Sequence, residues 1–208
     1  MKHAGNCRFC DINFGEYKFH GVDEPFAENR DYFAVASIGA FIEGWTLIVP
    51  KKHQLSMRNC FDDQNMVTLV SDVSERLMRQ YGSVVTFEHG SNAEGSATAC
   101  GTDHAHLHLV PLKESLVSDL NNSGMDWLRC STSEIVSIAG DKEYLFYADL
   151  KLNSSWVNPE GYLHVLERPI SQYFRQLLAK RFDCSAQSDY KLFPFLQNSI
   201  QTRSALAV

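Results

Sequence analysis

The stretch that decides the fold is His104-Ala105-His106-Leu107-His108-Leu109-Val110-Pro111, in which histidine alternates with apolar residues until a proline ends the pattern. Side chains alternate across a β-strand, so the three imidazoles share one face, and Ala105, Leu107 and Leu109 share the other. The apolar face can pack on a core and hold the strand rigid. We therefore predict a strand from His104 to Val110 with three neighbouring histidines on one face.

Three imidazoles on one strand face favour a chemical function over a simple solvated surface. Imidazole has an unperturbed pKa of about 6.5 and serves as a nucleophile, as an acid or base, or as a metal ligand. At about 3.3 Å per residue the three positions span about 13 Å, which is too far for one small ion, although adjacent pairs could chelate one. The spacing better suits a division of labour, in which one imidazole attacks and its neighbours orient it or bind substrate oxygens.

The residues before this strand predict further strands and one long helix. Two apolar runs, Tyr32 to Ala36 and Trp45 to Val49, are separated by glycines and predict two strands. Apolar residues recur at helical spacing from Asp62 to Tyr81 and predict a helix. The segment from Val84 to Phe87 predicts another strand, and Glu88 to Thr102 predicts a loop of small residues.

The residues after Pro111 predict a smaller α/β extension. It is expected to contain a polar loop, two strands that form a hairpin, and a helix, in the order 113–126, 144–150, 162–167 and 171–182. Strands, a helix and further strands with short links indicate an α+β fold on an antiparallel sheet. We predict a catalytic domain over residues 1–112 and an extension over residues 113–208 that packs on it.

Composition excludes several classes of protein. The 208 residues are 44% hydrophobic, which is enough for a core and excludes a disordered chain or a coiled coil. The 19 Lys and Arg against 25 Asp and Glu give a net charge of −6, so we expect no bulk nucleic-acid or anionic-membrane binding. A local phosphate site remains compatible with that charge.

Targeting signals and cysteine usage predict a cytoplasmic protein. No stretch reaches about 18 uninterrupted apolar residues, and the N-terminus lacks the apolar segment of a signal peptide. In a reducing compartment the six cysteines are better interpreted as thiols or metal ligands than as disulfide partners. Cys7 and Cys10 form a C-x-x-C pattern, which by itself fits a metal site, a redox pair or two unrelated thiols.

Three separate motifs resemble those of the histidine-triad (HIT) family. His104 to Val110 is similar to the family motif H-φ-H-φ-H-φ-φ. Cys7 to Ile12 resembles the C-x-F-C-x-I entry of zinc-bearing members, and Gly44 to His53 resembles their G-H-x-L-φ-φ-P-K-x-H segment. The residues around Gln172 and Arg175 are also similar to a C-terminal extension of some longer HIT-like proteins. The resemblance implies a HIT-like fold over roughly residues 5–112.

The resemblance also implies roles for individual residues. His106, the middle histidine, would attack the α-phosphorus of a nucleotide ester, anhydride or phosphoramidate and form a covalent nucleotidyl-imidazole. His108 would contact phosphate oxygens or protonate the leaving group. Four residues would bind a structural Zn²⁺ ion in a closed tetrahedral site, namely Cys7, Cys10, His53 and His104.

The chain departs from the family pattern beside the triad. Trp45 stands where many members have histidine, Glu88-His89-Gly90 replaces the more usual Asn-x-Gly, and Ala99-Cys100-Gly101-Thr102 replaces G-Q-[ST]-V. His89 has no motif context and is expected to be an ordinary surface or core residue. These departures also suggest that the extension completes the site through Arg175. The expected substrate-binding residues are Gly90, Cys100, Gly101, Thr102, Trp45 and Glu88.

Three functions fit these residues. The first is a nucleotidyl hydrolase or transferase that cleaves at the α-phosphate of a small nucleotide substrate. The second is a nucleotidylyltransferase or phosphorylase whose acceptor is phosphate or a sugar phosphate. The third is a nucleotide-binding protein with little turnover, because the Gln and Ser that commonly assist the leaving group are absent. The resemblance to compact HIT proteins also implies a possible homodimer.

Overall fold

A computed structural model describes residues 7–150, 156 and 158–207 of the chain, and the structural statements below refer to these residues. They form one eight-stranded sheet in the order β1-β2-β3-β5-β4-β7-β8-β6, with every neighbouring pair antiparallel. The fold is therefore α+β on an antiparallel sheet, as the sequence predicts. The strands are β1 (Ala27–Glu28), β2 (Tyr32–Ala36), β3 (Thr46–Pro50), β4 (Val84–Gly90), β5 (Leu107–Pro111), β6 (Leu128–Ser131), β7 (Tyr144–Leu150) and β8 (Glu160–Val165).

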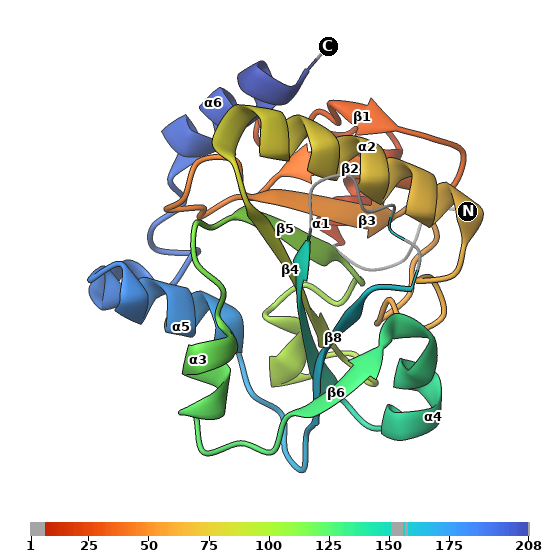
Figure 1. The fold of residues 1–208 in the computed structure, drawn as a ribbon. Helices are drawn as coiled ribbons and strands as arrows, with labels where there is room; N and C mark the ends of the chain where they lie inside the picture. Colours follow the sequence, from red (N-terminus) through yellow and green to blue (C-terminus); the bar gives the residue numbers. More distant parts are fainter. Residues whose placement is uncertain (1–6, 151–155, 157, 208) are drawn as a thin grey trace.

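Helices cover both faces of this sheet, and α2 crosses one of the faces in Figure 1. The helices are α1 (Arg8–Asn13), α2 (Gln64–Tyr81), α3 (Val117–Asn121), α4 (Ile135–Ala139), α5 (Tyr173–Arg181) and α6 (Leu196–Leu206). Helices α2 and α4 share one apolar core with Leu107 and Leu109, whereas α1, α3 and α5 share the other core with Phe87 and Val110. Burial of each large apolar side chain stabilises the fold by about 1.5–3 kcal/mol, so the two cores hold the sheet rigidly between the helices.

The long helix has the boundaries that its sequence indicates. The Asp63 carboxylate accepts hydrogen bonds from the amides of Asn65 and Met66 at the N-terminus, and Gly82 follows the last residue with a positive φ of 92°. Met66, Val70 and other apolar residues at helical spacing face the sheet. The prediction of a helix after the second apolar strand is thus confirmed.

The histidine strand is shorter than predicted. Regular pairing begins at Leu107, which lies opposite Ile48, although β3 itself continues to Pro50. Ala105 instead donates its amide to the carbonyl of Gln54 at 2.6 Å. The alternation still holds, since Ala105 lies in the core under α2 and the three histidines face the opposite side, where α1 packs.

The extension contributes strands to the same sheet. β7 pairs with β4, and β8 pairs with β7, so the strands predicted at residues 144–150 and 162–167 are both present, the second of them at Glu160–Val165. The turn expected at Asn158 to Gly161 is only partly correct, because Glu160 and Gly161 already belong to β8, where they pair with β6. The division of the chain into two domains at residue 112 stays a prediction.

Several elements of the extension have no clear sequence signal. Helix α3 lies in the segment predicted as a loop, and β6 is only four residues long. Helix α6 lacks an apolar stripe because it is attached through hydroxyls: Ser199 donates to the carbonyl of Ser37, and Thr202 accepts from the amide of Gly44. Hydrogen bonds of this kind depend on the distant partner and leave no periodic pattern.

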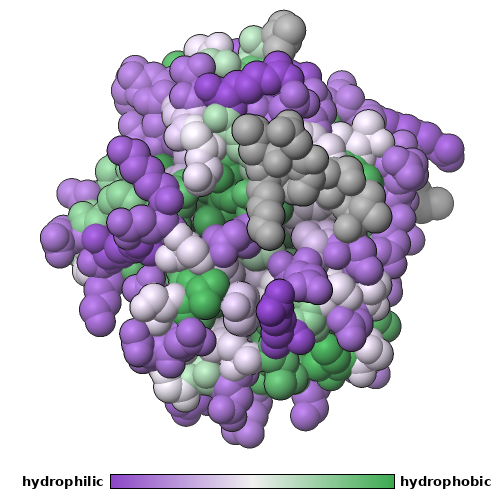
Figure 2. Space-filling model, in the orientation of Figure 1, coloured by the Kyte–Doolittle hydropathy of each residue, from purple (hydrophilic) through white to green (hydrophobic). Residues whose placement is uncertain are grey.

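The surface carries mainly hydrophilic side chains on the face shown in Figure 2, with smaller apolar areas between them. Across the described parts of the chain, every helix is too short or too polar to span a lipid bilayer.

Candidate functional site

The His106 side chain is held in one tautomer. Its Nδ1 lies 2.8 Å from the backbone carbonyl oxygen of His104, and since a carbonyl only accepts, Nδ1 carries the proton. The lone pair of the neutral ring is therefore on Nε2. Burial lowers the pKa of His106 below its ordinary value, and Arg8 lowers it further. The ring is thus neutral near pH 7, with an unprotonated nitrogen available as a nucleophile.

The His108 ring is fixed from two sides. The indole Nε1–H of Trp45 donates to Nδ1 of His108 at 2.9 Å, so the proton of the neutral ring is on Nε2. The ring stacks on Phe87 with centroids 4.5 Å apart. Burial holds the pKa of His108 well below its usual range, and the neighbouring His106 adds to this effect. His108 therefore offers a proton donor beside the lone pair of His106, whose ring centroid lies 4.8 Å away.

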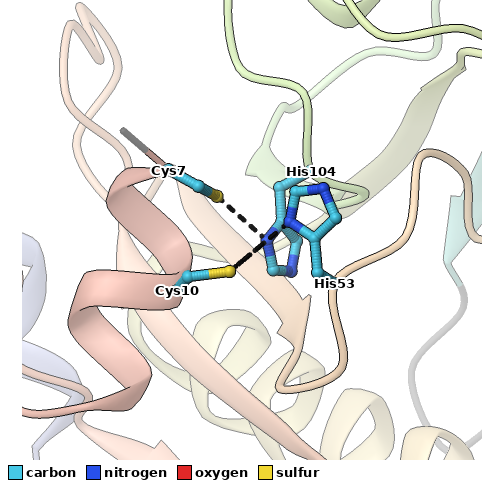
Figure 3. Close-up of side chains that lie close together, drawn as sticks. All are labelled: Cys7, Cys10, His53 and His104. Atoms are coloured by element: carbon cyan, nitrogen blue, oxygen red, sulfur yellow. Dashed lines mark hydrogen bonds between the residues drawn. The ribbon is translucent and has the colours of Figure 1, made fainter. Parts of the chain in front are cut away.

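His104 belongs to a different cluster, shown in Figure 3 with Cys7, Cys10 and His53. The ligand atoms of these four side chains all lie within 4.8 Å of one another. Nδ1 of His104 is 3.3 Å from Sγ of Cys7 and 3.6 Å from Sγ of Cys10, and Nδ1 of His53 is 3.4 Å from Sγ of Cys10. The four residues that the resemblance implies as metal ligands therefore meet at one point.

The donor set and its spacing fit a metal ion. A tetrahedral ion with metal–ligand bonds of about 2.0–2.3 Å requires ligand atoms roughly 3.3–3.8 Å apart, which agrees with these three nitrogen–sulfur distances. Nε2 of His104 donates to the carbonyl of Pro50 at 2.8 Å and so leaves the lone pair of Nδ1 directed at the two sulfurs. Cys7 precedes α1 and Cys10 lies in its first turn, so the short helix presents both thiols on one side. The cluster could hold a metal ion.

The metal-type cluster and the nucleophile are adjacent. The carbonyl that fixes the tautomer of His106 belongs to His104. The Phe9 ring, between the two cysteines in sequence, makes edge contacts with His104 at 5.6 Å and with His106 at 5.4 Å between centroids. A change in the cluster can therefore reach the nucleophile through one backbone carbonyl and one aromatic ring.

A cavity lies in front of His106 and His108. Five of the predicted residues line it together: Trp45, Cys100, Thr102, His106 and His108. The sequence did not single out several others, including Phe9, Ser37, Ile38, Leu47, Phe87, His89 and Tyr190. Arg175 lines the cavity as well, in agreement with the expectation that the extension reaches the site. None of the described Asp or Glu residues is among the lining side chains.

Two of the expected substrate-binding residues lie elsewhere. Glu88 points to the opposite side of β4, where its carboxylate accepts from the amide of Met57 at 2.5 Å and from the hydroxyl of Tyr144 at 2.6 Å. A Cβ on Gly90 would lie 2.2 Å from the Tyr144 ring, so this glycine makes room for the ring. The placement of Glu88 and Gly90 corrects the expectation of substrate contact, because strand alternation directs even-numbered residues of β4 away from the triad.

The loop before the triad is held by its own amides and by the extension. The amides of Cys100 and Thr102 donate within the loop, to the carbonyls of Ala97 and Ala99, so these two are engaged. Cys100 adopts a positive φ of 56°, and its sulfur accepts from the amide of Gln172 at 3.1 Å. Gly101, also expected at the substrate, is not among the lining residues.

His89 is a site residue that sequence reasoning missed. It lies on the same face of β4 as Phe87, which pairs directly with His108. The amide of Phe174 donates to Nε2 of His89 at 3.4 Å, so the proton of the neutral ring is on Nδ1, which is buried without a partner in the described residues. Burial lowers the pKa of His89 to about 3. The alternation Val85, Phe87, His89 next to the triad strand was the signal that could have found it.

Comparisons with known proteins identify relatives in the histidine-triad (HIT) family. No protein-family model matches the chain. An uncharacterised 16.1 kDa HIT-like protein of Mycoplasma pneumoniae is 30% identical over 112 residues, which cover 53% of this chain and 74% of that protein. An uncharacterised HIT-like protein of Mycoplasma genitalium is 28% identical over 117 residues, which cover 54% of this chain and 77% of that protein. The chain belongs to the HIT family.

Among solved structures, one described as a uridylyltransferase aligns over 99% of this chain and 93% of its own, with a TM-score of 0.48 and 10% identity.

Proposed function

We propose that the protein is a nucleotidyl hydrolase or transferase in which His106 is the nucleophile. The observation that carries this proposal is the hydrogen bond from Nδ1 of His106 to the carbonyl of His104, which leaves Nε2 unprotonated in a cavity that none of the described Asp or Glu residues lines. A lone pair in such a cavity suits attack on an anionic phosphorus centre, because no carboxylate repels the substrate. Membership of the HIT family supports the same chemistry.

The reaction has two displacements at the α-phosphorus. In the first, Nε2 of His106 forms a bond to phosphorus while the bond to the leaving group breaks, and the leaving atom keeps the electron pair. In the second, water or another acceptor attacks phosphorus and Nε2 leaves with its pair. His108, whose proton is on Nε2, donates to a phosphoryl oxygen or to the leaving atom.

We propose zinc as the ion of the four-residue cluster, because two thiols and two imidazoles at these separations match its preferred ligands. With four protein ligands the ion would have no open position, so it would supply structural support rather than chemistry. Cys7 and Cys10 would then join the start of α1 to His53 and to His104 at the start of the triad.

The substrate needs more room than the cavity provides. The free volume of the cavity is about 60 Å³, whereas small-molecule sites usually measure about 300–1,000 Å³. Tyr190, which lines the cavity, is attached to the loop through the hydrogen bond from its hydroxyl to the carbonyl of Cys100 at 3.2 Å. Binding of a nucleotide therefore includes a displacement of part of this wall.

The test is direct detection of the covalent intermediate. The protein is incubated with adenosine phosphoramidate, diadenosine polyphosphates and nucleotide sugars, quenched in acid-free denaturant, and measured by intact mass. We expect a nucleotidyl adduct and released monophosphate, both lost in His106→Asn. The matched control is His164→Asn, at a half-buried histidine outside the cavity, and it should keep full activity.

Two results would count against the proposal. Full activity in His106→Asn would show that His106 is not the nucleophile. Tight nucleotide binding with neither an adduct nor turnover would identify a nucleotide-binding protein instead, which the absent Gln and Ser beside the triad would then explain.

A further inference from the structure

Arg175 is a buried cation that forms no ion pair with a carboxylate of the described residues, although Asp189 is near enough to raise its pKa. Its side chain extends from α5, and the residue is only 6% exposed. No ion pair joins it to an Asp or Glu among the described residues, although other arginines, such as Arg8 with Asp23 and Arg181 with Glu114, are paired. Burial lowers its pKa only to about 10, so the guanidinium stays charged at neutral pH. A buried charge without a counter-ion is costly, which indicates that its partner is a ligand.

The guanidinium is held rigidly by neutral groups. Its Nε and Nη2 donate to the backbone carbonyls of Ser188 and Gly39. Its central carbon lies 5.1 Å from the ring centroid of Phe41 and 5.6 Å from that of Trp45. Carbonyls and aromatic faces orient the group without neutralising it, and the described contacts use only part of its five N–H donors. A planar fork with remaining donors suits phosphate oxygens.

Arg175 opens on the same cavity as the nucleophile. Both line it, and Trp45 connects them, since its ring packs under Arg175 and its Nε1–H holds His108. Because Trp45 contacts both Arg175 and His108, the guanidinium lies on the His108 side of the cavity.

We infer that Arg175 binds a second phosphate group, adjacent to the one that His106 attacks, and that the protein selects substrates in which the α-phosphorus is joined to another phosphate. This inference rests on the proposed function. When the bond from the α-phosphorus to the bridging oxygen breaks, that oxygen keeps the electron pair, and the departing phosphate gains negative charge next to Arg175. In the reverse direction an incoming phosphate oxygen attacks the α-phosphorus from the same position, and Nε2 of His106 leaves.

The first experiment compares two substrates that differ only in the leaving group. The same nucleotidyl group is supplied with a phosphate leaving group, as in a dinucleoside polyphosphate, and with ammonia as leaving group, as in a phosphoramidate. For Arg175→Gln we expect kcat/KM to fall about 10- to 150-fold with the first substrate, the cost of hydrogen bonds to charged groups. With the second substrate it should stay within about 3-fold. Arg175→Lys should recover part of the loss.

A second arm tests phosphate as the acceptor. The nucleotidyl adduct formed from the phosphoramidate is chased with inorganic phosphate, and the ratio of nucleoside diphosphate to monophosphate is measured. A diphosphate product in the wild type that is absent in Arg175→Gln assigns the position to an incoming phosphate. If Arg175→Gln lowers kcat/KM with the dinucleoside polyphosphate but leaves the diphosphate product unchanged, Arg175 binds the departing phosphate. Either outcome supports a phosphate at Arg175.

Controls separate the role of Arg175 from folding and from the proposed function. Arg129→Gln removes an exposed, ion-paired arginine and should change neither substrate. Binding of inorganic phosphate to the resting protein, measured by calorimetry, should be lost in Arg175→Gln and kept in Arg175→Lys and Arg129→Gln. Phosphate binding can be measured even if the wild type forms no adduct. A missing adduct would contradict the proposed function but not the role of Arg175. Equal losses on both substrates, or unchanged phosphate binding, would overturn the inference.

Discussion

The indole nitrogen of Trp45 donates a hydrogen bond to Nδ1 of His108, 2.9 Å away. Trp45 precedes β3, and β3 pairs with β5 so that Leu47 lies opposite His108. The indole is fully buried and also packs edge-on against Phe87, the residue on which His108 stacks. Trp45 therefore does more than line the cavity, because it selects the tautomer of a triad histidine.

Removal of the indole donor should disturb His108. Trp45→Phe keeps an aromatic ring but leaves Nδ1 of His108 free to take the proton. A donor facing Nδ1 opposes protonation, so its loss raises the pKa of His108 and allows the wrong tautomer. We expect kcat/KM to fall about 10- to 100-fold, since one hydrogen bond contributes on the order of 1–3 kcal/mol here. The loss should be largest at higher pH, where His108 is neutral and can adopt the wrong tautomer, and smaller where both of its nitrogens carry a proton. A uniform loss at every pH would indicate a packing effect instead.

The pH dependence of the reaction should reflect the depressed pKa of His106. The unprotonated ring is the nucleophile, so activity is present above its pKa and is lost as pH falls through it. Because burial lowers this pKa below 6.5, kcat/KM should be constant from pH 8 to about 6.5 and decline only at lower pH. Measurement of kcat/KM with the phosphoramidate across pH 4.5–8 checks this. An acid limb above pH 7 contradicts the assignment.

The metal-type cluster should contribute to both stability and activity. We expect about one zinc per chain by elemental analysis and its loss in Cys10→Ser, together with a lower Tm, because a structural site contributes folding free energy. Activity should fall as well, since the His104 carbonyl positions His106. Cys184→Ser, outside the cluster, is the control. If the wild type contains no metal and keeps its Tm in the presence of a chelator, the cluster is not a structural metal site.

Glu88 should make stability depend on pH. Burial raises its pKa to about 7, against 4.5 for an ordinary glutamate. The folded state thus binds a proton more tightly than the unfolded state, so this stabilisation is complete below pH 4.5 and is lost as pH rises toward and past 7. In Glu88→Gln the free energy of unfolding should lose this decline between pH 5 and 8, as measured by urea denaturation. Glu160→Gln, an exposed control, should keep it.

The sequence predicted those elements whose residues repeat with a clear period. The apolar runs of β2, β3 and β7 and the helical spacing of α2 are visible locally, because burial on a sheet or along one helix face repeats every two or every three to four residues. The elements α3, β6, α4 and α6 are short or attached by polar contacts, so no such period marks them. Their positions follow from partners far away in the chain.

By itself, the sequence determined that three imidazoles share a strand face and that Cys7 and Cys10 form a C-x-x-C pattern, whereas His53 and His104 were added to the ligand set only by the family resemblance. Both patterns are properties of local geometry and of side-chain chemistry. Only the tertiary structure decided that Trp45 holds His108, that His89 stands beside the triad while Glu88 faces away from it, and that Arg175 forms no ion pair with the described Asp and Glu residues. These relationships depend on strand register and on how α5 packs over the sheet, and neither is encoded by the residues near the motif.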